Sequence, residues 1–240
     1  MSQPAVAALT SLPFELVYSD GEPLETYWHV LQMNLLIDVI FQAMVERGRS
    51  DFFVGGDNFV YYSREQARDV AAGRPYFRGP DVYYVDGVER RERKAWVAWE
   101  EGGRLPDVIV ELLSPSTAEV DRTVKKDLYA RAFRTREYFL YDPDTAKLEG
   151  FRLKRDTYQP LMSNIRGRLE SEQLGLEFGQ WHGRVRDLET TWLRLFHPDG
   201  RLAPTEAEAA EARAEAERQR AEAAEAELER LRAQLRGGTT

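Results

Sequence analysis

The chain has 240 residues, enough for one globular domain with an appendage but too few for a second domain of enzymatic size. A hydrophobic fraction of 42% predicts a packed core, and a net charge of −8 argues against the basic surface of non-specific nucleic-acid binders. Cysteine is absent, which excludes disulfides and thiolate metal sites. Because a signal peptide and long apolar runs are also absent, we expect a cytoplasmic protein that does not span a membrane.

The first expected element is a long buried helix. Residues 26–47 place apolar side chains at helical spacing, and Arg47-Gly48 supplies a cationic last turn and a stop. Short runs rich in β-branched and aromatic residues follow, separated by glycine, proline and charged turns. They predict a sheet with strands at 52–62, 81–85, 94–99 and 107–113.

A second helix is expected directly after the last of these strands, with Ser116 or Thr117 as its N-cap. Apolar residues recur every four positions along it and predict its buried face: Val120, Val124, Leu128 and Ala132. A strand at 137–142, a hairpin within 148–161 and an apolar closing segment complete the pattern. The order helix, strands, helix, strand predicts a mixed α/β fold.

The composition divides the chain into three regions: an N-terminal arm at 1–24, a domain at 25–200 and a tail at 201–240. Alanine, glutamate and arginine dominate the tail. Its apolar residues fall at the a and d positions of a heptad, interrupted by Glu217: Ala207, Ala210, Ala214, Ala221, Ala224, Leu228, Leu231 and Leu235. Because alanine buries little area, the tail is either a solvated single helix or a coiled-coil helix that forms a homodimer through its leucine-rich end.

The first candidate for chemistry is Glu111. It lies in VIVELL, residues 108–113, a run that is otherwise apolar on both faces as in an interior strand. A carboxylate there loses its water and needs a cationic partner. If the strand after Asp81 runs antiparallel to this one, Asp81 lies beside Glu111. Two such carboxylates suit Mg²⁺, which lowers the pKa of an attacking water and stabilises phosphorane charge, so phosphodiester hydrolysis is the expected use.

Two further charged residues are candidates with open alternatives. Asp107 shares a strand face with Glu111, but about 13 Å separates them, too far for one metal. Asp107 therefore needs a local bend, belongs to a second site or is a turn residue after Pro106. Lys125 is one of few lysines in an arginine-rich chain and suits a compact charge that orients water or stabilises a phosphate oxygen. The alternative is a surface lysine, and Lys126 points further from the predicted face.

Other catalytic patterns are missing. The histidines lack paired metal-ligand spacing, which disfavours a zinc hydrolase: they are His29, His182 and His197. We expect His29 to be a core or rim histidine. Gly55-Gly56 lacks the Lys-Ser/Thr of a P-loop.

The middle of the chain resembles a known family signature: PDVIVELLSPST at 106–117, then Asp121, Lys125 and Tyr129, then EYFLYDP at 137–143. That signature belongs to the Uma-type family of bacterial endonucleases, within the PD-(D/E)xK restriction-endonuclease-like superfamily. The upstream GPDVYYV resembles the first PD strand of the family. The resemblance covers most of 25–200 and implies a restriction-endonuclease-like mixed sheet flanked by helices.

The resemblance also implies roles for individual residues. Asp81 and Glu111 become the metal carboxylates. The superfamily's lysine two residues after the glutamate is absent, since Leu113 stands there, and Lys125 is implied as its replacement. Segment 133–136 lacks the family's glycine-containing turn, a departure that we expect to affect only loop geometry.

The sequence therefore favours an endonuclease that depends on Mg²⁺ or Mn²⁺, with this candidate catalytic set: Asp81, Asp107, Glu111 and Lys125. The alternative is a catalytically silent nuclease-fold module that pairs through its tail. DNA is the expected substrate and RNA stays open, because the metal chemistry is common to both. A local groove would hold the nucleic acid through arginines such as Arg78, Arg122 and Arg131.

Overall fold

The computed structural model describes residues 13–14, 26–74 and 79–237. The chain divides into two compact units, one ending at Ala203 and the other beginning at Pro204, close to the predicted start of the tail. All the strands that the structure describes lie in the first unit, and the second contains one helix, α5 (Glu206–Gly237). The predicted arm at 1–24 lies outside the described residues except for 13–14.

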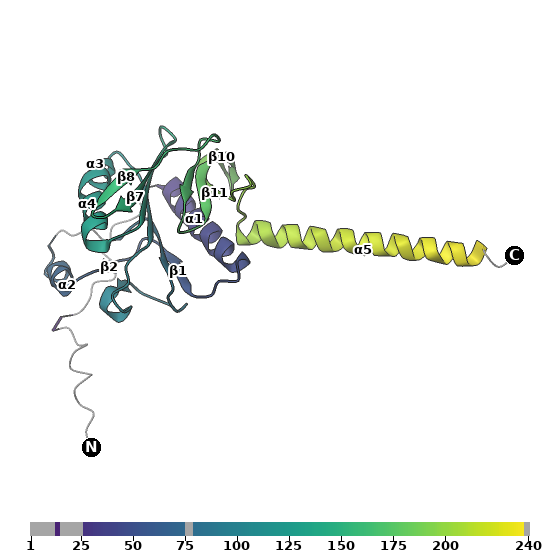
Figure 1. The fold of residues 1–240 in the computed structure, drawn as a ribbon, viewed down its shortest axis with the longest axis horizontal. Helices are drawn as coiled ribbons and strands as arrows, with labels where there is room; N and C mark the ends of the chain where they lie inside the picture. Colours follow the sequence, from purple (N-terminus) through teal and green to yellow (C-terminus); the bar gives the residue numbers. More distant parts are fainter. Residues whose placement is uncertain (1–12, 15–25, 75–78, 238–240) are drawn as a thin grey trace, which may run out of the picture. The chain divides into compact units, whose positions relative to one another are not determined.

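The first unit is built on a mixed six-stranded sheet in the order β1-β3-β5-β6-β7-β8 (Figure 1). All neighbours in it are antiparallel except β5 and β6, which run parallel. The predicted mixed α/β class is confirmed. The strands are β1 (Phe52–Gly55), β3 (Val82–Asp86), β5 (Val108–Leu112), β6 (Glu137–Asp142), β7 (Lys147–Lys154) and β8 (Thr157–Pro160).

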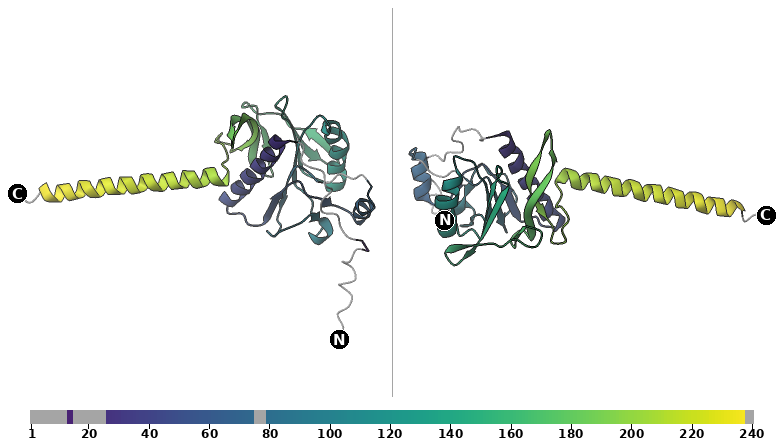
Figure 2. Two further views of the ribbon diagram at one scale, coloured as in Figure 1. Left: turned by 180° about the vertical axis from the view of Figure 1, so that it is seen from behind. Right: turned by 90° about the horizontal axis from the view of Figure 1, so that it is seen from above.

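Helix α1 (Tyr27–Glu46) covers one face of this sheet, as the views in Figure 1 and Figure 2 agree. Thr26 caps it by accepting a hydrogen bond from the His29 backbone, so the predicted first helix is confirmed. A second, antiparallel sheet shares its core: β9 (Leu169–Ser171), β10 (Leu176–Val185) and β11 (Leu188–Phe196). By length and composition α1 could cross a membrane, but 61% of its most apolar window is buried in protein, as in a core helix.

The opposite face of the sheet carries one continuous helical segment, residues 118–133. It combines α3 (Ala118–Val120), the π-helical η3 (Asp121–Lys125), α4 (Lys126–Leu128) and the π-helical η4 (Tyr129–Phe133).

The predicted single run at 52–62 and the strand at 94–99 were too long. Short pieces of each form a separate parallel pair, β2 (Val60–Tyr61) with β4 (Trp96–Val97), followed by α2 (Arg64–Ala71) and η2 (Ala98–Glu100) respectively.

The predicted buried face of the 118–133 helix was wrong by one position. Val124 is 51% exposed, whereas Asp121, Tyr129 and Phe133 are buried against the sheet. Exposing one valine costs about 1.5–3 kcal/mol, while a buried charge without a partner costs several kcal/mol. Because Glu111 faces this helix from the sheet, polar partners for it outweigh an apolar stripe.

Helix α5 leaves its apolar heptad positions uncovered within its own unit. Leu228 and Leu231 are about half exposed, and the side chain of Leu235 lies outside the described part. Its ion pairs join residues three apart on the helix, such as Arg230 with Glu227. The choice between a solvated helix and a dimerisation helix therefore stays a prediction.

Gln32 offers a test of how α1 is held against the second sheet. β11 is an edge strand, and the buried Gln32 side chain donates to the Leu193 carbonyl at 2.9 Å and accepts from the Leu193 amide at 2.8 Å. We expect Gln32→Ala to lower the free energy of unfolding by about 2–4 kcal/mol, because two buried backbone groups lose their partner. Urea denaturation measures this. Asn34→Ala, on the exposed side of α1, is the control and should change stability by less than about 0.5 kcal/mol; equal losses would contradict the assignment.

Candidate active site

Asp81 and Glu111 meet because of strand register. In the antiparallel pair β3 and β5, Val82 faces Val110, so Asp81 and Glu111 are the next residues opposite one another. The Leu112 amide donates to Asp81 Oδ2 at 2.6 Å, and the Asp81 amide approaches Glu111 Oε2 at 3.4 Å. The antiparallel arrangement predicted from the sequence therefore brings the two carboxylates together.

The loop after β1 crosses closely over the start of β3. A Cβ atom at Gly56 would lie 1.8 Å from the Asp81 carbonyl oxygen, so only glycine fits there. The next residue, Asp57, has a left-handed φ of 52° and donates its amide to Pro80. Burial, followed by the charge of Asp81, raises the pKa of Asp57. A second carboxyl group is thus held near Asp81 by a conformation that asparagine, aspartate and glycine tolerate best.

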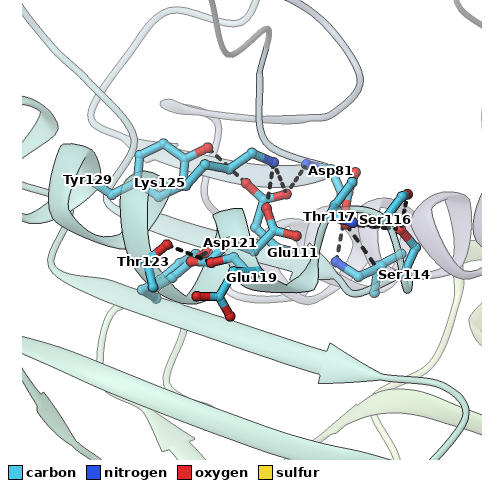
Figure 3. A network of polar contacts seen from close by, with 12 residues as sticks. Asp81, Glu111, Ser114, Ser116, Thr117, Glu119, Asp121, Thr123, Lys125 and Tyr129 are labelled. Atoms are coloured by element: carbon cyan, nitrogen blue, oxygen red, sulfur yellow. Dashed lines mark hydrogen bonds and ion pairs between the residues drawn. The ribbon is translucent and has the colours of Figure 1, made fainter.

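The 118–133 helix brings a lysine, a carboxylate and a phenol to Glu111 (Figure 3). Lys125 Nζ lies 3.1 Å from Glu111 Oε2 and 2.8 Å from Asp121 Oδ1. The Tyr129 hydroxyl donates to Glu111 Oε1 at 2.8 Å. Asp121, Lys125 and Tyr129 are four residues apart in sequence, and the π-helical turns at 121–125 and 129–133 accompany this face; such turns are frequent at functional sites.

His29 approaches the same cluster from α1. Its Nε2 lies 3.1 Å from Asp81 Oδ1, and the residue is 8% exposed. It is therefore a buried rim histidine, as expected from the sequence, but one that contacts a predicted site residue. The sequence could not show this, because α1 and β3 are joined by a long segment and meet only in the fold.

Negative charge exceeds positive charge in this cluster. Asp81, Glu111 and Asp121 contribute three carboxyl groups, and Lys125 is the cation that contacts two of them. Burial of Glu111 raises its pKa to about 8; the positive charge of Lys125 opposes the shift, and Asp81 adds to it. The carboxylates around Lys125 outweigh its burial and raise its pKa, which keeps it protonated. The cluster therefore favours any further positive charge.

A divalent cation fits these residues. Three of the four carboxylate oxygens of Asp81 and Glu111 have one donor within 3.5 Å, and because a carboxylate oxygen has two lone pairs, each of these three retains a free acceptor position. Glu111 Oε2 has two donors, Lys125 Nζ and the Asp81 amide. In the described part of the chain, no group of three or more acidic, histidine or cysteine side chains is placed to hold a metal ion. Mg²⁺ needs only one or two carboxylates and takes its other ligands from water or phosphate.

Asp107 does not join the cluster. It precedes β5, at the opposite end of the strand from Glu111, where it accepts a hydrogen bond from the Asp86 amide at 2.8 Å. Arg136 lies 3.5 Å away from it. Burial is the main cause of its raised pKa. These contacts favour the structural alternative that the sequence left open.

The structure describes two of the three arginines named for the predicted groove, and the groove itself stays a prediction. Arg122 pairs with Glu149 at 3.0 Å, and Arg131 pairs with Asp127 at 2.8 Å. Arg78 lies outside the described residues. Two of the three guanidinium groups therefore already have carboxylate partners.

Asp121 is the residue whose role was not predicted. It is 1% exposed, and its Oδ1 atom accepts no hydrogen bond of normal geometry from the described residues, although Lys125 Nζ is in ionic contact with it. The four-residue spacing from Lys125 was the available signal, since it places both on one helix face. The predicted buried face of this helix was apolar and therefore did not include Asp121.

The turn between β5 and the helix carries three hydroxyl groups. Thr117 occupies the N-cap position, as one of the two predicted alternatives, but its side chain makes no capping hydrogen bond. Its hydroxyl instead lies 3.0 Å from that of Ser114, which also contacts Ser116 at 2.9 Å. The turn is therefore stabilised by hydroxyl contacts within itself.

The chain matches a family model and is similar to solved structures. Residues 9–212 match the model of the Uma2 family, described as "Putative restriction endonuclease". The chain is also similar to the crystal structure of a "putative nuclease belonging to DUF820" from Anabaena variabilis, with 15% identity and a TM-score of 0.44 over 65% of this chain and 81% of the other. No curated protein matches the chain.

The buried carboxylate predicts an unusual dependence of stability on pH. Below about pH 4.5, Glu111 is protonated in both folded and unfolded chains; as the pH rises towards 8, the unfolded chain loses this proton and the folded protein keeps it. The wild type should therefore lose stability relative to Glu111→Gln over this window, by at most about 1.4 kcal/mol per pH unit.

Urea denaturation from pH 5 to 9 in EDTA measures this difference. Glu119→Gln is the matched control, because Glu119 is an exposed glutamate on the helix that packs over Glu111. Its curve should run parallel to that of the wild type. If the Glu111→Gln curve also runs parallel, the pKa of Glu111 is not raised.

Proposed function

This chain belongs to the Uma2 family of restriction-endonuclease-like proteins, and we propose that it is a metal-dependent endonuclease that hydrolyses phosphodiester bonds in DNA. The observation that carries the proposal is the buried group of Asp81, Glu111 and Lys125, which combines two carboxylates with a single lysine. Family membership supports nuclease chemistry, and the surplus of negative charge supports a cation as its partner.

Asp81 and Glu111 are the residues that would hold Mg²⁺ or Mn²⁺. The metal would supply a water of lowered pKa and neutralise charge that develops on the phosphate. Asp81 is the more accessible of the two carboxylates, with a side chain that is 22% exposed against 1% for Glu111. Substrate would therefore approach from the Asp81 side, while Glu111 forms the closed floor of the site.

Lys125 would bring a fixed positive charge to the reacting phosphate. Its side chain is 14% exposed and its Nζ is already close to Glu111, so it needs little reorganisation to act on an oxygen beside that carboxylate. Asp121 acts through Lys125, because the 2.8 Å ion pair fixes the position of the amine. It is a positioning residue in this proposal. Asp107 is left out because its contacts are at the other end of β5.

DNA is the proposed substrate, and the cytoplasm is the proposed location. DNA is favoured by the family description, and RNA would present the same phosphodiester to the same groups. An overall charge of −8 predicts weak binding to phosphates outside the site. Because the salt dependence grows with the number of phosphates neutralised, it should be shallow. A cytoplasmic location stays a prediction from the absence of cysteine.

Cleavage of supercoiled plasmid with Mg²⁺ or Mn²⁺ tests the function directly. We expect nicking by the wild type, none in EDTA, and a loss of about 100- to 1000-fold in rate for Glu111→Gln and Lys125→Ala. Asp121→Asn should lower the rate less, and should have no further effect in a chain that already carries Lys125→Ala, because it acts through that amine.

Lys126→Ala is the matched control for this panel. Lys126 is the neighbouring lysine, but its Nζ lies over the Phe151 ring, 3.3 Å from the centroid and away from the carboxylates. It should keep wild-type activity. If the wild type is inert with either metal, and calorimetry detects no binding of Mn²⁺, the alternative of a silent nuclease-fold module is favoured.

We also propose that α5 joins two copies of the chain through its C-terminal heptads. In parallel pairing, Arg220 would face Glu225 of the other copy, and Glu227 would face Arg232, both attractive, around the Leu228 and Leu231 layers. Sedimentation equilibrium should give a concentration-dependent dimer that Leu228→Glu abolishes. Even weak pairing, with a binding free energy of about 5–6 kcal/mol, is populated at about 100 µM. If the chain is monomeric up to that concentration, α5 is a solvated helix.

A further inference from the structure

A cavity of about 380 Å³ opens beside the carboxylate cluster. It lies between the start of α1, the turn after β5, the turn between β6 and β7, and β11. Its size falls within the range of small-molecule and cofactor sites. Its lining includes the side chains of Trp28, His29, Ser114, Asp144 and Thr190.

The cavity and the cluster share a wall. His29 lines the cavity and lies 3.1 Å from Asp81 Oδ1. Leu113 and Ser114 also line it, two and three residues after Glu111 on the same chain segment. A nucleotide in the cavity would therefore be next to a phosphate held at the carboxylates.

The charges of the lining argue against a phosphate in the cavity itself. None of the side chains that line it in the described structure is lysine or arginine, and Asp144 is acidic. A phosphate would lose its water and meet a carboxylate, which is unfavourable. The uncharged part of a nucleotide, its base, has no such cost.

The lining also offers what a base binds. Trp28 supplies aromatic surface, and its ring is held by stacking against Trp192 at 6.0 Å and Tyr141 at 6.2 Å between centroids. The hydroxyls of Ser114 and Thr190 and the carboxylate of Asp144 are able to bond the polar edge of a base. Aromatic contact with polar groups around it is the usual way in which proteins bind unpaired bases.

We propose that this cavity binds an unpaired nucleobase adjacent to the phosphate at the carboxylate cluster. A base inside a duplex is covered on both faces and paired along its edge, so it enters such a cavity only after it leaves the stack. The preferred substrate class is therefore single-stranded nucleic acid or duplex with unpaired nucleotides. The position of the cleaved bond relative to this base rests on the proposed function.

Binding of fluorescent oligonucleotides tests the proposal independently of cleavage. Ca²⁺ replaces Mg²⁺, because it takes the same oxygen ligands, and gels verify that the strands stay intact. The four ligands are a single-stranded DNA, the same sequence as RNA, the matching duplex, and a single strand with abasic sites. We expect the two intact single strands to bind at least ten-fold more tightly than the duplex and the abasic strand.

Two variants locate the base. Trp28→Leu removes the aromatic surface, and Thr190→Phe fills the cavity from β11 without changing Trp28. Each should weaken single-strand binding about ten-fold or more and leave duplex binding unchanged. Trp99→Leu is the matched control, because Trp99 packs in a different cluster beside Tyr61. If Trp28→Leu unfolds in a thermal melt, Thr190→Phe decides.

The outcomes separate this proposal from the proposed function. Equal binding of intact and abasic strands, or equal effects of both cavity variants on duplex and single strand, would overturn the cavity assignment even if plasmid is cut. Base-dependent binding that Thr190→Phe removes would support it even in a chain that cleaves nothing. If the RNA strand binds more tightly than the DNA strand, the cavity assignment is supported and the protein also makes a ribose-specific contact.

Discussion

Glu111 carries a carboxylate on an interior strand of a mixed sheet, where it is fully buried. The desolvation of that group is the constraint to which the surrounding elements respond. Tyr129 donates a hydrogen bond to one of its oxygens, Lys125 places a positive charge on the other, and Asp81 is held opposite by strand register. Replacing Tyr129 or Lys125 by an apolar side chain would leave the buried carboxyl group with too few contacts. The sheet therefore tolerates Glu111 only with this shell around it.

The 118–133 helix shows the same constraint acting on secondary structure. Its apolar residue Val124 points to solvent so that Asp121 and Lys125 face the sheet. The helix also contains two π-helical turns, which are less favourable than regular α-helix and persist where tertiary contacts compensate. A lysine on this helix thereby lies beside Glu111, while Leu113, two residues after Glu111 on the chain, packs in the core.

The carboxylate cluster and the neighbouring cavity offer a substrate different kinds of contact. The cluster at Asp81 and Glu111 is acidic and attracts cations, whereas the cavity beside His29 combines aromatic, hydroxyl and apolar groups with the carboxylate of Asp144. The turn that begins at Ser114 lines the cavity, and hydroxyl contacts within the turn stabilise it. This arrangement suits a substrate that has a charged backbone and uncharged side groups.

The sequence by itself determined the α/β class, the first helix, the central strands and the closing hairpin, because each depends on local periodicity and turn residues. It also predicted that Asp81 and Glu111 meet if their strands run antiparallel, and the family resemblance implied Lys125 as their companion. The phase of the 118–133 helix, the partner role of Asp121, the approach of His29 and the structural placement of Asp107 were decided by the tertiary structure. The physical reason is that burying a charge costs more than exposing an apolar side chain, and this cost exists only when distant segments come into contact.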